Sequence, residues 1–298
     1  RLLTVTGVQT CALPIYGTLW TCGYNTQGVL GNGTITHYSS PIQVGSLTSW
    51  SYVNTGSYTT LAVKTDGTLW SCGYSGSYGK LGNGTIISYS SPVQVGSLNN
   101  WLYASTSWQN SGGVTYTKTG NISQDLGQRY VSKDYLLDVY PNIASATGAR
   151  TTPGIWMWGY NGHGQLGNGT TTDYSSPIQV GSLTTWKQLS GNYTSFGAIK
   201  TDGTLWVWGL NKYASYPGGQ LGNGTTISYS SPVQVGSLTN WKQVSMSIWG
   251  SGAIKTDGTL WTWGDFTFGS SGNGTNVSYS SPIQIGSLTK DRKSTRLN

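Results

Sequence analysis

The chain has 298 residues, including 44 Gly, 14 Trp and 20 Tyr, and only 8% of its residues are charged. This aromatic content argues against intrinsic disorder, and the many Thr, Tyr, Trp, Val and Ile residues favour strands over helices. The net charge of +7 comes largely from the two ends, because residues 16–289 hold 11 basic and 8 acidic residues, so no nucleic-acid partner is expected. No apolar run is long enough to predict a membrane span.

The two ends of the chain differ from the rest. Residues 1–15 and 290–298 match no repeat, and each junction interrupts a repeat in the middle. We expect both segments to be non-native, adaptor-like sequence, and the remainder to be a truncated fragment of a longer gene. The alternative for residues 1–15 is the end of a secretory signal, although Thr, Gly and Gln break its apolar stretch.

A nine-residue sequence, SSPVQVGSL, recurs five times with only Ile and Val exchanged. Successive copies are about fifty residues apart, except for one spacing of 85, and self-similarity at such a period is typical of repeat architectures. The prolines of the five copies are Pro41, Pro92, Pro177, Pro232 and Pro282. The predicted units are 16–49, which is partial, 50–100, 101–185, 186–240 and 241–289.

Each full unit contains four short segments typical of strands. In the last unit they are 241–245 (WKQVS), 252–258 (GAIKTDG), 259–264 (TLWTWG) and 280–288 (SSPIQIGSL). The Asp-Gly pair between the second and third segments predicts a type I′ hairpin turn, with positive φ at both residues. One Asp per unit offers too few oxygen ligands for a metal, so no metal site is predicted. Four strands per unit predict an all-β chain, a β-propeller of small sheets.

The combination of AIKTDGTLWTWG, GQLGNGT and SSPVQVGSL resembles the repeats of the regulator of chromosome condensation family, in their bacterial or phage form, over about residues 16–289. The resemblance implies a propeller, which in this family is typically seven-bladed. About five four-stranded blades are expected here, as an open arc or a smaller ring. The family usually carries a His before the second strand, where this chain has GSYTTLAV or GNYTSFGAI, so functions of that position are not carried over.

Two further recurrent features are interpreted as structural. The sequence LGNGT lacks the Lys and the strand-to-helix setting of a phosphate-binding loop, so we predict a turn. Cys22 and Cys72 occupy the position that Trp158, Trp208 and Trp263 hold in other units. We expect them to be small buried side chains that replace an indole.

Residues 122–154 are predicted to be an insertion at a hairpin tip, which accounts for the long spacing. The insertion is rich in charged residues, and its segment 132–141 (SKDYLLDVYP) matches a short capped helix. It is either a tolerated surface loop or a projection that contacts a partner. Its candidate contact residues are Asp125, Arg129, Tyr135 and Asp138.

The segments between the third strand and LGNGT vary in length and content, and we expect them to cluster at one end of the sheets. Exposed aromatic residues among Asn, Ser and Gly provide a large contact area at a low entropic cost. The alternative is that some of these rings pack between blades. The candidate binding residues are Tyr74, Tyr78, Tyr160, His163, Tyr213, Tyr216 and Phe266.

Catalysis is not expected, because the chain has two His, no Glu and no recognisable pairing of a nucleophile with a base. We therefore predict a non-enzymatic scaffold without a cofactor, which recognises an unknown protein through one end of the propeller and the insertion. The first alternative is a glycan-binding surface module, and the second, implied by the resemblance, is guanine-nucleotide exchange on a small GTPase. Low charge and many small polar residues favour a secreted, cell-surface or virion location.

Overall fold

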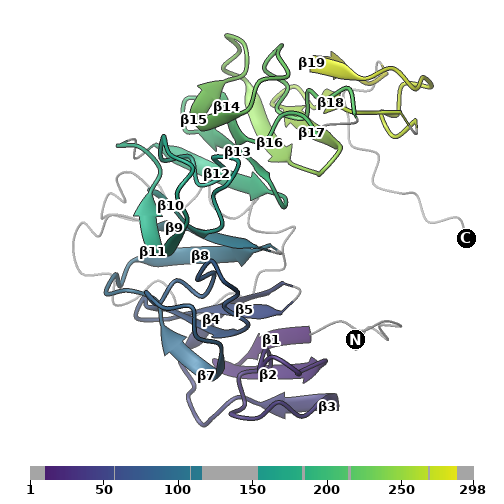
Figure 1. Ribbon diagram of the computed structural model, residues 1–298. Coiled ribbons are helices and arrows are strands. Elements are labelled where there is room, and N and C mark those ends of the chain that lie inside the picture. Colours follow the sequence, from purple (N-terminus) through teal and green to yellow (C-terminus); the bar gives the residue numbers. More distant parts are fainter. Residues whose placement is uncertain are drawn as a thin grey trace, which may run out of the picture. The chain divides into compact units, whose positions relative to one another are not determined.

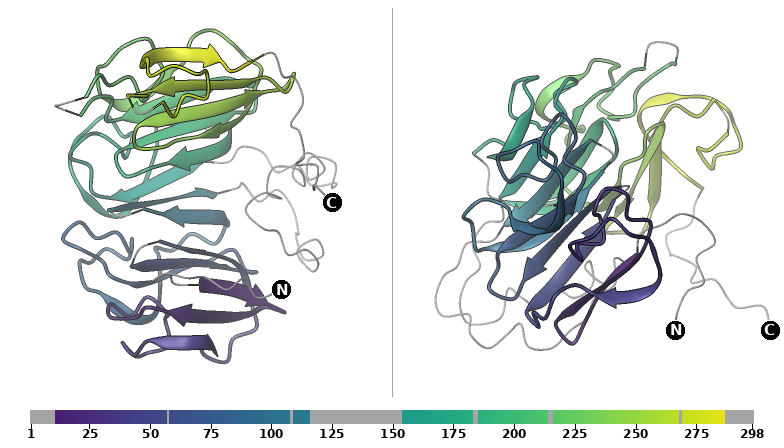
Figure 2. Two further views of the ribbon diagram at one scale, coloured as in Figure 1. Left: turned by 90° about the vertical axis from the view of Figure 1, so that its right-hand side faces the viewer. Right: turned by 60° about the horizontal axis from the view of Figure 1, so that its bottom comes forward.

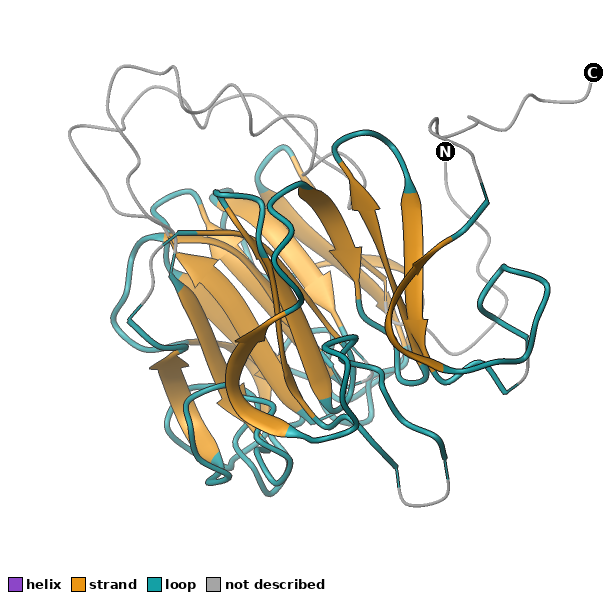
Figure 3. Ribbon diagram, turned by 90° about the horizontal axis from the view of Figure 1, so that it is seen from above, coloured by secondary structure: helices purple, strands orange, loops and turns teal. Residues whose placement is uncertain are grey.

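Figure 1 shows the computed structural model of the chain, which describes residues 11–56, 58–107, 109–115, 154–182, 185–213, 216–267 and 269–286. The regular elements of these residues are all strands, drawn in orange in Figure 3, and they form five antiparallel sheets in which consecutive strands pair. Sheet 1 consists of β1 (Cys11–Ile15), β2 (Thr18–Gly23) and β3 (Tyr38–Gln43). Sheet 2 consists of β4 (Trp50–Thr55), β5 (Thr59–Lys64), β6 (Leu69–Gly73) and β7 (Tyr89–Gln94).

The other three sheets repeat the plan of sheet 2. Sheet 3 consists of β8 (Trp101–Thr106), β9 (Asn110–Thr115), β10 (Ile155–Gly159) and β11 (Tyr174–Gln179). Sheet 4 consists of β12 (Trp186–Gly191), β13 (Ser195–Lys200), β14 (Leu205–Gly209) and β15 (Tyr229–Gln234). Sheet 5 consists of β16 (Trp241–Ser245), β17 (Gly250–Lys255), β18 (Leu260–Gly264) and β19 (Tyr279–Gln284).

The predicted all-β fold of small antiparallel sheets is confirmed. Sheets 2 to 5 have the expected four strands, whereas sheet 1 has three. Its first strand, β1, lies in the segment that matches no repeat, yet it pairs with β2 from Cys11↔Cys22 to Ile15↔Thr18. This strand therefore takes the place that the second strand holds in the other sheets, while the non-native origin of residues 1–15 stays a prediction.

The chain divides into two compact units. Unit 1 comprises residues 1–160 and 173–179 and so holds sheets 1 to 3, and unit 2 comprises residues 161–172 and 180–298 and holds sheets 4 and 5. Within each unit, neighbouring sheets pack against each other, as Figure 2 shows for the purple-to-teal sheets of unit 1.

The hairpin between the second and third strands differs from the prediction. Gly67 has the positive φ, +82°, whereas the preceding Asp66 does not, so the turn is not type I′. Strand pairing ends at Val63↔Leu69, which leaves a five-residue connection closed by a hydrogen bond from the Gly67 N–H to the Lys64 carbonyl at 2.9 Å. The Asp side chain determines the shape of this turn, because Asp66 Oδ1 accepts hydrogen bonds from the N–H and hydroxyl of Thr68 at 2.9 and 2.7 Å.

The same hairpin anchors the first Trp of the third strand. Trp70 Nε1 donates to Thr68 Oγ1 at 2.9 Å, and the same hydroxyl donates to Asp66. The Nζ of Lys64 lies 3.7 Å from the centre of the Trp70 ring, in the geometry of a cation–π contact. The equivalent sets in sheets 4 and 5 have the same contacts; they are Lys200, Asp202, Thr204 and Trp206, and Lys255, Asp257, Thr259 and Trp261.

The LGNGT sequence connects one sheet to the next. In unit 1 a Cβ on Gly82 would lie 2.6 Å from Nε1 of Trp158, so only glycine allows the indole of sheet 3 to approach. That indole donates to the Lys80 carbonyl at 2.8 Å. Between sheets 1 and 2, Cys72 replaces the indole, is 2% exposed, and contacts the Val29 carbonyl through Sγ at 3.7 Å. The expected exchange of an indole for a buried Cys is therefore confirmed at Cys72, whereas Cys22 is only half-buried.

The proline segment completes this contact between sheets. A Cβ on Gly28 would lie 2.5 Å from Cα of Ser90, and one on Gly164 would lie 2.5 Å from Cα of Ser230. The glycine loop of one sheet therefore rests on the first Ser of the next sheet's SSP sequence. The same backbone contact recurs at Gly79 with Ser175 and at Gly219 with Ser280, which accounts for the repeated SSP sequence.

Candidate binding surface

Two loops meet at one end of each of sheets 2 to 5, which we call the loop end. One loop joins the first and second strands, and the other follows the third strand. A backbone hydrogen bond links them, for example from the Tyr74 N–H to the Tyr58 carbonyl at 2.7 Å and from the Asp265 N–H to the Trp249 carbonyl at 2.8 Å. The variable segments named from the sequence therefore begin beside a second set of loops that the sequence did not point to.

A buried Asn gives the loop after the third strand a fixed shape. The Oδ1 of Asn25 accepts the N–H of Leu30 at 2.9 Å, and its Nδ2 donates to the carbonyls of Thr34 and Thr36, both at 3.0 Å. Asn161 and Asn211 make the equivalent bonds in unit 2. All three Asn side chains are fully buried, so the loops present their remaining side chains from a rigid base.

In unit 1 a row of four rings crosses from sheet 1 to sheet 2, and we call it the ring row. Tyr24 stacks on His37 with ring centres 4.7 Å apart, Tyr24 meets Tyr58 at 6.2 Å, and Tyr58 meets Tyr74 at 6.5 Å. Tyr74 is 41% exposed. The backbone N–H of Asn25 donates to His37 Nδ1 at 2.9 Å, which fixes that imidazole in the row.

A second ring contact in unit 1 joins sheets 2 and 3. Tyr78 and Tyr160 are half-buried and lie with ring centres 4.7 Å apart. Close by in the chain, Lys80 is only 2% exposed, and its Nζ lies 5.7 Å from the centre of the Tyr74 ring. Burial lowers the pKa of Lys80 to about 8. This lysine stands where unit 2 has the buried Gln165 and Gln220.

In unit 2 three rings form a compact group, which we call the ring cluster: Tyr213, Tyr216 and Trp249. The Trp249 ring lies 5.2 Å from Tyr213 and 4.5 Å from Tyr216, centre to centre, and Trp249 is 41% exposed. The Tyr213 hydroxyl is 2.9 Å from Thr194 Oγ1. Asn192 Nδ2 donates to the Ser247 carbonyl at 2.8 Å, which holds the two loops of sheets 4 and 5 together.

Phe266 is a correction to the predicted surface. It is 2% exposed, and a Cβ on Gly250 would lie 2.3 Å from its ring. It stands two residues after Gly264, where Asn25 and Asn211 stand after their own glycines, and so it fills the buried position at the base of the loop. The prediction that its ring is exposed is therefore wrong.

His163 lies in the loop after β10 and is half-buried. Its backbone N–H donates to Gln165 Oε1 at 2.9 Å, and burial lowers the pKa of its imidazole. The structure therefore places His163 in the variable loop that follows the third strand of sheet 3, as the sequence predicted.

Two residues were missed by sequence reasoning. Tyr58 and Trp249 hold the same position, directly before the second strand, where Gln109 and Thr194 stand in the other sheets. An aromatic residue in place of a polar one at one repeat position was the available signal. Both residues lie outside the loop after the third strand, where the binding residues were expected.

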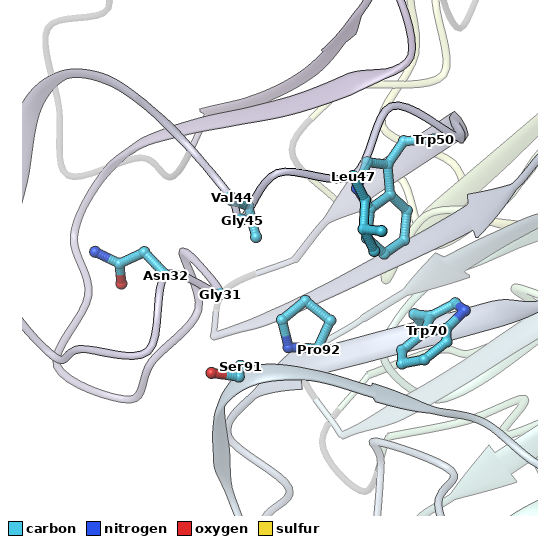
Figure 4. Close-up of a pocket in the computed structure, with 9 residues that line it drawn as sticks. All are labelled: Gly31, Asn32, Val44, Gly45, Leu47, Trp50, Trp70, Ser91 and Pro92. Atoms are coloured by element: carbon cyan, nitrogen blue, oxygen red, sulfur yellow. The ribbon is translucent and has the colours of Figure 1, made fainter.

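A hollow of about 270 Å³ lies between sheets 1 and 2 in unit 1 (Figure 4). Trp50 and Trp70 are among the residues that line it, and their rings meet edge to face at 6.3 Å. The lining residues are Gly31, Asn32, Val44, Gly45, Leu47, Trp50, Trp70, Ser91 and Pro92. These are consensus residues of the contact between sheets, so we assign the hollow to packing.

The described residues contain no group of three or more His, Cys, Asp or Glu able to hold a metal ion. They also contain no helix long and apolar enough to cross a membrane. The candidates of the insertion, Asp125, Arg129, Tyr135 and Asp138, lie outside the described residues.

A family model for the regulator of chromosome condensation (RCC1) repeat matches residues 16–63, 66–113, 154–194 and 202–254, which is more than half of the chain. The chain belongs to the RCC1 repeat family. The resemblance seen in the hairpin and glycine motifs is thereby confirmed. The segment 114–153, between the second and third RCC1 matches, contains nearly all of the predicted insertion.

Curated RCC1-type relatives match only part of this chain. Ultraviolet-B receptor UVR8 of Arabidopsis thaliana is 34% identical over 95 residues, which cover 31% of this chain and 20% of that protein. The mitochondrial RCC1 domain-containing protein RUG3 of the same plant is 31% identical over 116 residues, or 37% and 25% of the two chains. E3 ubiquitin-protein ligase HERC2 of Homo sapiens is 30% identical over 123 residues, which are 37% of this chain and 2% of HERC2. The chain thus spans a quarter or less of each relative.

Solved RCC1-type structures share the fold. Human WBSCR16 superposes with a TM-score of 0.66 at 18% identity, covering 91% of this chain and 63% of that one. Yeast RCC1 (Prp20), in a structure with Kap60, gives 0.63 at 14% identity and covers 91% and 57%. These likenesses establish the β-propeller fold for the RCC1 repeats described above.

Proposed function

We propose that this RCC1-repeat chain is a non-enzymatic scaffold that binds a protein partner at the loop end of its sheets. The ring row of unit 1 and the ring cluster of unit 2 would each be a contact surface. The insertion 122–154, which follows β9 at the opposite end of sheet 3, would provide a separate contact. The observation that carries the proposal is the group of half-exposed rings around Trp249.

The other residues that recur in the repeats already make contacts that hold the fold together. The Asp66 carboxylate accepts two hydrogen bonds from Thr68, and the Lys64 ammonium lies over Trp70. The glycines of LGNGT are held against the neighbouring sheet. Function is therefore expected in residues that depart from the repeat, and the exposed rings at the loop end are such residues.

The chemistry of these rings suits a protein surface. Tyr and Trp combine a large apolar area with a polar atom and lose little side-chain entropy on binding, which is why they dominate interface energetics. The rigid Asn-anchored loops reduce the cost of ordering further. Catalysis has less support, because His37 is fixed by Asn25 and stacks on Tyr24. Yeast RCC1 in complex with Kap60 provides an example of a protein partner within the family.

A displayed random-peptide library selected against the full chain tests the proposal. We expect peptides whose binding weakens at least about tenfold in Trp249→Ala and in Tyr74→Ala, since truncating an aromatic anchor costs over 1 kcal/mol. The matched control is Leu238→Ala, which removes a side chain that is 43% exposed and follows β15 at the opposite end of sheet 4. Peptides that bind all three variants equally would contradict the assignment of this surface.

The role of the insertion is tested separately by replacing residues 122–153 with a short Gly-Ser linker. We expect an intact fold, judged by Trp fluorescence and by protection of Cys72 from thiol reagents, together with weaker peptide binding. Unchanged binding would remove the insertion from the proposal. A glycan array with saturable binding lost in Trp249→Ala, or acceleration of nucleotide release from a small GTPase, would replace the protein-binding proposal with the corresponding alternative.

A further inference from the structure

Sheets 2, 4 and 5 each hold a lysine ammonium against a pair of tryptophan rings. The pair consists of the Trp that opens the first strand and the first Trp of the third strand, with ring centres 6.3, 6.4 and 6.1 Å apart in the three sheets. The lysine Nζ lies 3.7, 3.7 and 3.6 Å from the centre of the third-strand ring, and 5.1, 5.2 and 5.1 Å from the centre of the first-strand ring. Figure 4 shows the pair of sheet 2, Trp50 and Trp70. In this molecule the Trp pair is therefore a binding site for an ammonium group.

Sheet 3 keeps the ring pair but has no lysine at this position. The ring centres of Trp101 and Trp156 lie 6.4 Å apart, with an angle of 63° between the planes, against 84°, 87° and 81° in the other pairs. Thr115 lies opposite Trp101 on the neighbouring strand, where Lys200 lies opposite Trp186 in sheet 4. Residues opposite each other in an antiparallel pair share one face of the sheet, so Thr115 occupies the position of the lysine. Across the described residues, no lysine contacts either ring of this pair.

The Thr115 side chain does not take the place of the ammonium. Trp156 Nε1 donates to Thr115 Oγ1 at 3.1 Å, and that hydroxyl donates to the Gly154 carbonyl at 3.4 Å. An acceptor of an indole N–H lies at the edge of the ring and close to its plane, so this hydroxyl does not lie over the ring face. Trp156 is half-buried, as Trp206 is in sheet 4, whereas Trp101 is only 2% exposed. The pair thus combines one ring that reaches solvent with one buried ring.

We propose that the Trp101–Trp156 pair binds an alkylammonium group from outside the chain, the group found at the end of a lysine side chain. The ammonium would lie over the Trp156 ring with Trp101 as the second wall, in the geometry that Lys200 has over Trp206. The ligand would supply the cation that the other three sheets supply from their own second strand. This site lies within sheet 3 and is separate from the ring groups of the proposed function.

NMR of the full chain with isotope-labelled Trp, titrated with butylammonium chloride at constant ionic strength, tests the site. We expect the Nε1 peak of Trp156, assigned with Trp156→Phe, to shift saturably. The peak of Trp206 should stay in place, because Lys200 already fills its pair. Butanol, which has the same carbon chain without the charge, should bind at least about tenfold more weakly. A Trp156 peak that does not move, or that moves equally with butanol, overturns the proposal.

Exchanging one residue between sheets should move the site. Thr115→Lys supplies the ammonium from within the chain and should abolish the response of Trp156. Lys200→Thr empties the pair of sheet 4, whose indole keeps its hydrogen bond to Thr204, and should make the Trp206 peak respond to butylammonium. Lys187→Thr is the matched control, because it is the same substitution at an exposed lysine of that sheet.

The two exchanges give independent answers, and the unchanged Nε1 peaks of the other Trp residues show that each variant is folded. A Trp156 response that survives Thr115→Lys overturns the proposal, and so does a Trp206 peak that stays unresponsive in Lys200→Thr. A lysine blocked as its N-acetyl methylamide then separates the sources of the group. Tighter binding than butylammonium indicates the lysine of a protein, and equal binding indicates a free alkylamine; both outcomes support the site.

Discussion

At the scale of single residues, Lys80 departs most from its repeat position. Its backbone makes the contact that recurs at this repeat position, since the Lys80 carbonyl accepts hydrogen bonds from Trp158 Nε1 at 2.8 Å and Ser111 Oγ at 3.0 Å. Its side chain sets Lys80 apart, because it is only 2% exposed and this burial lowers its pKa from 10.5 to about 8. The folded chain therefore holds this proton less tightly than the unfolded chain, at a cost of about 3 kcal/mol below pH 8.

Lys80→Gln should stabilise the chain at pH 7, because Gln occupies this position in unit 2 without a charge. We expect a gain of about 1–2 kcal/mol in the free energy of unfolding, below the full cost, because the buried Nε2 of Gln165 and Gln220 has no hydrogen-bond partner among the described residues. Between pH 8 and 10.5 the unfolded wild type still binds the proton that the folded form has lost, so wild-type stability rises with pH and the gain shrinks.

Urea unfolding followed by Trp fluorescence at pH 7 and at pH 10 measures this difference. Lys242→Gln is the matched control, since it removes the same charge from an exposed position. A gain that is equal at both pH values would show that the desolvation of Lys80 is not its source.

At the scale of the element, the hairpin depends on a short chain of side-chain hydrogen bonds. In sheet 4, Trp206 Nε1 donates to Thr204 Oγ1 at 2.8 Å, which donates to Asp202 Oδ1 at 2.6 Å. The backbone N–H of Thr204 donates to the same Asp202 oxygen at 2.9 Å, and these two bonds from Thr204 are the main reason that the pKa of Asp202 lies below its usual value. The carboxylate form is favoured in the folded state, so this stabilisation is present above the ordinary Asp pKa and is lost as the pH falls through the folded-state pKa.

Thr204→Val keeps the shape of the side chain and removes both hydrogen bonds of the hydroxyl, to Asp202 and from Trp206, while the backbone N–H bond to Asp202 stays. We expect a loss of about 1–2 kcal/mol in the free energy of unfolding and an upward shift of the Asp202 pKa toward its usual value, measured by urea unfolding and by NMR titration. Thr201→Val is the control, because it is the same substitution at an exposed residue three positions earlier. An unchanged Asp202 pKa would contradict the role given to Thr204.

The hairpin also shows what the sequence predicts about an element and where it fails. The alternation around TLWTWG placed the third strand within a residue of its observed bounds, because an apolar face must be buried. The turn type was predicted wrongly, because the Asp66 side chain binds Thr68 and stays out of positive φ, and a dipeptide preference does not include that contact. The predicted exposure of Phe266 was wrong for a related reason. Whether a ring in this loop is exposed depends on which residue fills the buried position at the base of the loop.

At the scale of the whole molecule, the repeat pattern predicted the sheets because each sheet has to meet its neighbour in the same way. It did not predict the ring groups, since Tyr58 and Trp249 approach their partners from loops that are distant in sequence. A series of similar sheets has a further consequence. Stability in such arrays is a sum of local terms and contacts between neighbours, so damage to one contact should stay local.

Two glycine variants test this locality. Gly31→Ala places a Cβ 2.8 Å from Cys72 Sγ, and Gly222→Ala places one 2.6 Å from Trp263, each at a φ of +72°. Both should cost about 1–3 kcal/mol, since each adds backbone strain to a close contact. Burial raises the pKa of Cys72 to about 12, so its thiol reacts only when the contact between sheets 1 and 2 opens.

In a background with Cys11 and Cys22 replaced by Ser, the labelling rate of Cys72 reports that opening. We expect Gly31→Ala to raise the rate about 10–100-fold, since each 1.4 kcal/mol is a factor of ten, and Gly222→Ala to leave it unchanged. Gly45→Ala, a positive-φ glycine with open space around it, controls for backbone strain alone. If Gly222→Ala raised the rate as much as Gly31→Ala, the sheets would open as one cooperative body, because a clash inside unit 2 would then have released a thiol inside unit 1.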